Sequence, residues 1–115
     1  MNRNMDLVRD ILISVADDKS EILKKYPDQE VCYHMAIMIE AGLLIGEALK
    51  NGAGVLPVFA HVDRLTWQGH DFLDAARHEE RWAWAKKAIG KLGGATFQVW
   101  TAVLTAYVRE KLGIK

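Results

Sequence analysis

Three side chains with metal-binding chemistry recur at intervals of four residues, namely His70, Asp74 and His78. Positions four apart share one face of a helix, so two neighbours in this set are able to contact one Zn²⁺ ion. His70 and His78, however, are about 12 Å apart along a helix axis, and no Cys-x-x-Cys pair completes a site. We therefore expect no metal centre, and we place His70 in a capping turn near Thr66.

A thiol and an imidazole lie two residues apart, at Cys32 and His34. On a helix their side chains point about 200° apart, which excludes a direct catalytic dyad. The chain has no Gly-x-Ser-x-Gly or P-loop sequence, and Gly52-Ala53-Gly54 lacks the third glycine of a dinucleotide site. The sequence therefore predicts a protein that is not an enzyme and uses no cofactor.

Length and composition are typical of one compact domain. The 115 residues are 50% hydrophobic, and fifteen Lys and Arg balance fifteen Asp and Glu. The polar start, Met1 to Asp6, lacks signal-peptide character, and charges interrupt the chain too often for a membrane span. A single cysteine is usual in a reduced compartment. We expect a cytoplasmic protein without membrane association.

Helical spacing of apolar residues dominates the first third of the chain. It predicts a helix from Met5 to Asp17, with Asn4 as the N-cap. A second helix is predicted from Pro27 to Ala41, ended by Gly42 in the left-handed conformation. Residues 18–26 have no periodicity long enough to assign.

Two apolar segments around a glycine-rich turn predict a β-hairpin. The first strand runs from Leu43 to Leu49, residues 50–54 form the turn, and the second strand runs from Val55 to Leu65. Pro57 cannot donate a ladder hydrogen bond, so it belongs at the strand start or on an open edge. This position is typical of a two-stranded wing.

The last part of the chain is predicted to be helical. Thr66 caps a helix that reaches Leu92, with a kink or break at residues 78–80, and a final helix covers 96–111. The order of elements predicts an α+β fold: a winged helix-turn-helix with a hairpin wing and extra C-terminal helices. We expect one domain over 1–115, with helices and wing in 1–66 and the C-terminal helical part in 67–115.

Five phrases of the chain carry a family resemblance. They are Met5-Asp6-Leu7-Val8-Arg9-Asp10-Ile11-Leu12, Val31-Cys32-Tyr33-His34, Glu40-Ala41-Gly42-Leu43, the segment from Leu65 to Asp74, and Lys111-Leu112-Gly113. With them the chain resembles the phage- and prophage-associated family called domain of unknown function 2513. The resemblance implies a winged-helix-like fold and a place in cellular or phage cytoplasm, and it supplies no catalytic residues.

DNA binding is the alternative function that a winged helix suggests. The helix over 28–41 would then be the recognition helix, yet it carries three acidic residues and no basic residue. Between Asp28 and Thr66 two basic residues stand against five acidic ones, a net charge of −3, which opposes phosphate. The candidate contacts are Gln29, Tyr33 and His34, with Lys50 and Asn51 at the wing tip. Tyr33 and His34 equally fit half-buried packing positions.

Four tryptophans, Trp67, Trp82, Trp84 and Trp100, are the most unusual feature of the composition. Trp82 and Trp84 are two residues apart, so they cannot both face one side of a helix. We expect one at the surface, where Trp and Arg are typical interface anchors. The candidate interface is Trp82, Trp84, Arg81 and Trp100. The predicted function is that of a phage- or prophage-type accessory protein, which contacts a protein partner or a second copy of itself.

Overall fold

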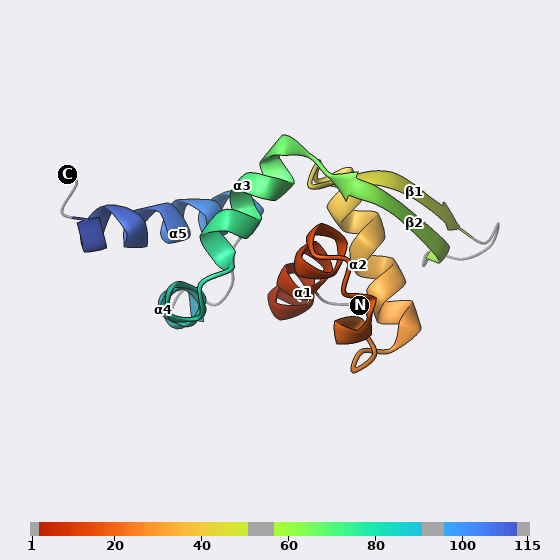
Figure 1. Ribbon diagram of the computed structural model, residues 1–115, viewed down its shortest axis with the longest axis horizontal. Coiled ribbons are helices and arrows are strands. Elements are labelled where there is room, and N and C mark those ends of the chain that lie inside the picture. The colour runs from red at the N-terminus through yellow and green to blue at the C-terminus, as the bar shows by residue number, and fades with distance from the viewer. Residues whose placement is uncertain (1–2, 51–56, 91–95, 113–115) are drawn as a thin grey trace. The chain divides into compact units, whose positions relative to one another are not determined.

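The computed structural model describes residues 3–50, 57–90 and 96–112 and has mixed α+β architecture (Figure 1). Its elements are α1 (Met5–Ala16), the 3₁₀ helix η1 (Ser20–Leu23), α2 (Asp28–Glu40), β1 (Leu44–Lys50), β2 (Pro57–Leu65), α3 (Trp67–Ala76), α4 (Glu79–Gly90) and α5 (Phe97–Leu112). The predicted helices and hairpin are confirmed, and the predicted break near residues 78–80 separates α3 from α4. Residues 18–26, left unassigned from sequence, contain η1.

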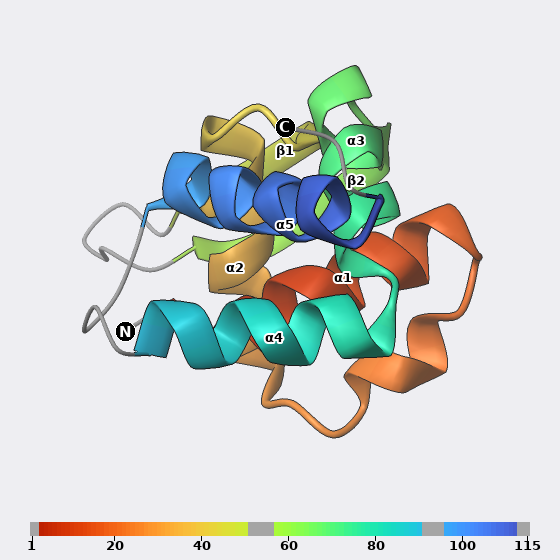
Figure 2. The same ribbon diagram turned by 90° about the vertical axis from the view of Figure 1, so that its left-hand side faces the viewer.

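The chain divides into two compact units, Met1–Asp71 and Phe72–Lys115, and we describe each by itself. This division falls inside α3, whereas the sequence predicted that the C-terminal helical part begins at Trp67, the first residue of α3. Unit 1 contains α1, η1, α2 and the hairpin. In unit 2, α4 and α5 lie next to each other and exchange ring contacts (Figure 2). The predicted wing tip and the glycines at 93 and 94 lie outside the described residues.

Helix α1 begins at the predicted cap. The Asn4 Oδ1 atom accepts hydrogen bonds from the backbone N–H groups of Asp6, at 3.0 Å, and Leu7, at 3.3 Å. These bonds satisfy two of the donors that a helix start leaves unpaired. The apolar stripe of the helix is buried as its spacing predicted, through Leu7, Val8, Ile11 and Leu12.

One interlocked junction joins α2, the hairpin and α3. Gly42 turns the chain after α2 with a φ of +81°, a conformation that glycine adopts without steric cost. The Thr66 backbone N–H donates to the Leu43 carbonyl at 3.0 Å, and the Thr66 hydroxyl donates to the Gly42 carbonyl. The same hydroxyl accepts from the Gly69 N–H at 3.0 Å, which confirms Thr66 as the cap of α3. We call these four residues the junction.

Strands β1 and β2 form an antiparallel pair whose two faces differ. Leu44 pairs with Leu65 at the junction end, and both are buried. Register shifts after Ile45 and after Leu49 mark bulges or irregularities in the ladder. Side chains alternate between the two faces of a strand. The hairpin therefore packs one face on the core of unit 1 and turns the other outward.

A hydrogen-bonded carboxylate ties the segment after η1 to α1. The Tyr26 hydroxyl donates to Asp10 Oδ2 at 2.7 Å, and Lys25 Nζ lies 3.2 Å from the same oxygen. Partial burial is the largest cause of the raised pKa of Tyr26, and the hydrogen bond and negative charge of Asp10 raise it further. Tyr26 is therefore held in its protonated, donating form.

We expect Tyr26→Phe to lower the free energy of unfolding by about 1 kcal/mol, because the variant loses one hydrogen bond to a charged group that solvent partly reaches. The wild type should also lose more stability than the variant above about pH 10, the unfolded pKa of tyrosine. There the unfolded state releases the Tyr26 proton while the folded state retains it. Urea denaturation at about pH 8 and about pH 11 measures both effects. Parallel pH profiles of the two proteins would contradict the pH prediction.

Candidate protein-interaction surface

The outer face of the hairpin carries large apolar side chains. Ile45, Leu49 and Phe59 alternate with the core-facing residues and are 41%, 57% and 52% exposed. Leu49 and Phe59 are cross-strand partners. A sheet face that meets water is usually polar, and neighbouring exposed apolar side chains are typical of interaction sites. This face is therefore suited to contact with another protein.

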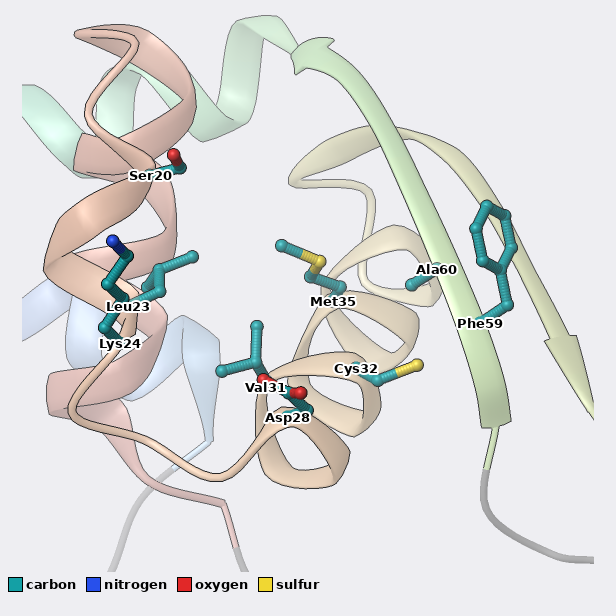
Figure 3. A pocket seen from close by; sticks show the side chains of 9 residues that line it. All are labelled: Ser20, Leu23, Lys24, Asp28, Val31, Cys32, Met35, Phe59 and Ala60. Carbon is teal, nitrogen blue, oxygen red and sulfur yellow. The ribbon is translucent and has the colours of Figure 1, made fainter.

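A groove of about 350 Å³ lies between η1, α2 and β2 (Figure 3). Leu23 on the η1 side points toward Val31 and Met35 of α2, and all three side chains are half-buried. The groove has an apolar middle and two exposed charged groups; its lining is Ser20, Leu23, Lys24, Asp28, Val31, Cys32, Met35, Phe59 and Ala60. The apolar middle of this lining suits an apolar group, and Lys24 is the one cation among the lining residues.

His34 is a structural residue, so its prediction as a base-contacting residue is wrong. The side chain is fully buried. Its Nε2 lies 2.8 Å from the Asn4 backbone nitrogen, and its Nδ1 lies 2.8 Å from the Glu30 carbonyl oxygen. A backbone N–H only donates and a carbonyl only accepts, so the ring is neutral with its proton on Nδ1. The Nε2 bond joins α2 to the start of α1, and the Nδ1 bond stays within α2.

The other predicted DNA contacts lie in different environments. Gln29 is exposed in the first turn of α2. Tyr33 is half-buried, and its ring meets the ring of His34 edge-on at 5.5 Å. Asn51 and the side chain of Lys50 lie outside the described residues. The described part of α2 therefore offers Gln29 and part of Tyr33, without a cation, to a ligand.

The two units carry opposite net charges. Unit 1 contains seven Lys and Arg against eleven Asp and Glu, a net charge of −4. Unit 2 contains eight Lys and Arg against four Asp and Glu, a net charge of +4. The groove and the hairpin thus belong to the acidic unit. Phosphate approach to that unit is electrostatically unfavourable.

Trp82 and Trp100 form the aromatic core of unit 2 rather than a surface. They are 4% and 6% exposed, and their rings stack with centroids 4.7 Å apart. Phe72 contacts Trp82 at 6.4 Å and Phe97 at 4.9 Å between ring centroids. The proposed interface must be corrected accordingly, because buried indoles offer no area to a partner.

Trp84 and Arg81 remain accessible in unit 2. Trp84 is 36% exposed and lies 5.3 Å from the Tyr107 ring, so the surface position expected for one of the paired tryptophans belongs to Trp84. Arg81 Nη1 donates to the Ala75 carbonyl at 3.2 Å, and its guanidinium lies 5.9 Å from the Tyr107 ring centroid. Arg81 therefore helps to fix the end of α3 while its charge borders the exposed aromatic pair.

Trp67 is the surface residue that sequence reasoning missed. The sequence predicted one of Trp82 and Trp84 at the surface, yet Trp67 is the tryptophan that is 81% exposed. Trp67 is the first residue of α3 and directly follows the Thr66 cap. Its place directly after the cap is the feature that separates it in the sequence from the other three tryptophans.

The thiol of Cys32 and the predicted absence of a metal centre can be compared with the described residues. Burial raises the pKa of the Cys32 thiol, which makes it a poor nucleophile at neutral pH. His70 and His78 are exposed, and no group of three His, Cys, Asp or Glu side chains within residues 3–50, 57–90 and 96–112 is placed to hold a metal ion. Nor does any helix in those ranges combine the length and apolarity needed to cross a bilayer.

Comparison with known proteins places these features in a family. The model of a family described as "Hypothetical protein (DUF2513)" matches residues 2–96. The chain belongs to the DUF2513 family. A DUF2513 match of this extent runs from α1 to α4 and includes the whole junction, whereas α5 lies beyond it.

A known protein matches this chain over a length similar to that of the family match. An uncharacterized protein of Haemophilus influenzae is 32% identical over 97 residues, which cover 77% of this chain and 79% of the relative. No solved structure matches the chain. The family assignment therefore rests on sequence, and the groove and the exposed side chains give the physical grounds for assigning a role.

Proposed function

We propose that this DUF2513 chain is a non-enzymatic winged-helix protein that acts by binding another protein. The order α1, η1, α2, hairpin supports the winged-helix assignment, with η1 in the place of the second helix, α2 as the recognition helix and the hairpin as the wing. The resemblance noted in the sequence further suggests an accessory role of phage or prophage type. Genes of phage proteins beside the gene of this chain would be expected on that basis.

One observation carries the proposal. Beside the proposed recognition helix and wing lies the groove, whose middle is apolar. Leu23, Val31 and Met35 form its middle, and one cation, Lys24, and one anion, Asp28, flank it. Apolar side chains in a concave site are typical of protein recognition, while phosphate contacts need cations or neutral donors.

Duplex binding is the decisive comparison between protein recognition and DNA recognition. A DNA-binding winged helix binds even random duplex, with dissociation constants of about 10⁻⁴–10⁻⁶ M at physiological salt and lower values at low salt. We expect no shift of random duplex by this protein at concentrations up to about 100 µM, a range that covers such non-specific binding. Electrophoretic mobility measures this directly. A shift that Gln29→Ala weakens, while Gln98→Ala at an exposed position of α5 leaves it unchanged, would overturn the proposal in favour of DNA reading by α2.

A further inference from the structure

Trp67 is a solvent-exposed apolar side chain at the hydrogen-bonded start of α3. It is 81% exposed, the highest exposed fraction among the large apolar side chains at the surface of the described residues. The junction fixes its backbone, because Thr66 is bonded to the carbonyls of Gly42 and Leu43 and to the Gly69 N–H. An exposed indole on a fixed backbone is the type of side chain that dominates protein interfaces.

The groove has the size and lining of a site for one such side chain. Its volume, about 350 Å³, is near the lower end of the range of about 300–1,000 Å³ seen for small-molecule pockets. A space of this size suits a single large side chain better than the face of a whole helix. The half-buried Leu23, Val31 and Met35 would cover an indole with apolar atoms.

The charges around the two features are complementary. The groove is flanked by one cation and one anion, the exposed Lys24 and Asp28. Trp67 is flanked by the exposed Arg64, three residues before it, and Asp71, one helical turn after it. Asp71 can therefore pair with Lys24 and Arg64 with Asp28 across a contact between two copies. A ligand with one sign of charge would leave half of these groups opposed by like charge.

We propose that the occupant of the groove is Trp67 of a second copy of this chain, in a reciprocal two-fold dimer. The proposal rests on the protein-binding function above and names its partner. Every residue it uses belongs to unit 1, so each copy offers one indole and one groove in a fixed relation. A two-fold axis places each indole in the other copy's groove, which closes the assembly at two chains.

The dimer should be weak and reversible. Each indole brings roughly 150–250 Å² into contact, so two insertions and their surroundings stay below the ~1,200 Å² of a stable interface. Sedimentation equilibrium over a wide concentration range is the appropriate measurement. We expect the wild type to change from monomer to dimer in the micromolar-to-millimolar range, and Trp67→Ala to raise the dissociation constant at least about tenfold.

Trp84→Ala is the matched control, because it removes the other partly exposed indole and leaves the groove untouched. We expect it to dimerise like the wild type. If Trp67→Ala dimerises like the wild type, the reciprocal insertion is overturned, whereas protein binding as the function stands. A wild type that remains monomeric at all concentrations also overturns the inference. The proposed function itself fails only by the duplex result described above, so the two failures are distinguishable.

A charge exchange tests the geometry with variants that should fold, since both positions are exposed. Lys24→Glu places an acid opposite Asp71 and should weaken the dimer. Adding Asp71→Lys to the same chain exchanges the pair and should restore the wild-type dissociation constant. A double variant no stronger than Lys24→Glu alone would exclude this contact and overturn the proposed docking.

Discussion

Replacing Phe72 by alanine is expected to lower the free energy of unfolding by about 3–5 kcal/mol, the usual loss for truncating a buried phenylalanine. The ring is buried and contacts both Trp82 and Phe97. Alanine would remove those contacts and leave a cavity that the stacked indoles of Trp82 and Trp100 fill poorly. We expect the loss of side-chain packing to begin in unit 2, which contains Phe72 and both contacting rings.

Chemical denaturation of Phe72→Ala and Phe59→Ala shows how much of the loss in unfolding free energy comes from burial, because the residue type is the same at both positions. Both variants lose the same atoms, but Phe59 lies on the outer face of the hairpin and is about half exposed. We expect Phe59→Ala to cost about 1 kcal/mol or less, because little area returns to water. Because the chain has two compact units, unfolding is to be fitted with more than one transition where the data require it. Equal losses in the two variants would show that Phe72 has been placed incorrectly.

Gly69→Ala is expected to destabilise the protein by about 2–3 kcal/mol through overpacking at the junction. A Cβ at Gly69 would lie 2.1 Å from the Leu43 carbonyl oxygen and 3.3 Å from Leu65 Cβ. That oxygen already accepts the Thr66 N–H, so it cannot retreat without loss of a hydrogen bond. The start of α3 and the end of the hairpin would have to move apart.

Two other glycines supply graded controls for Gly69→Ala. Gly90→Ala meets nothing within 4 Å, so it should leave stability unchanged or raise it by up to about 1 kcal/mol through helix propensity. Gly42→Ala also meets nothing, but its φ of +81° should cost about 1 kcal/mol in backbone strain. Thermal unfolding of the three variants should rank them Gly90→Ala, Gly42→Ala, Gly69→Ala from most to least stable. A Gly69→Ala variant as stable as Gly90→Ala would exclude the close approach.

Local rules predicted the elements because the relevant information lies within a few residues. Asn4 and Thr66 cap helices through atoms of the next turn, and Gly42 reverses the chain at a single position. The break between α3 and α4 was visible as a slip in apolar phase. Such features depend on neighbours in sequence, so they need no knowledge of the tertiary fold.

The surface was harder to predict because exposure depends on contacts distant in sequence. His34 accepts its hydrogen bond from Asn4, thirty residues earlier, and no pattern around His34 reveals that donor. Trp82 stacks on Trp100 of a later helix and is buried, whereas Trp67 is 81% exposed. The groove combines residues from η1, α2 and β2. Its existence therefore follows from packing rather than from any motif.

The distribution of tryptophans gives the molecule two separable optical reporters. Trp67 is the single indole of unit 1, while the other three belong to unit 2. An exposed indole emits at longer wavelength than buried ones, and the stacked Trp82 and Trp100 rings are close enough for their excited states to couple. Long-wavelength fluorescence comes mainly from Trp67 at the junction, with a smaller part from the 36% exposed Trp84, and near-ultraviolet circular dichroism follows the packing of α4 against α5.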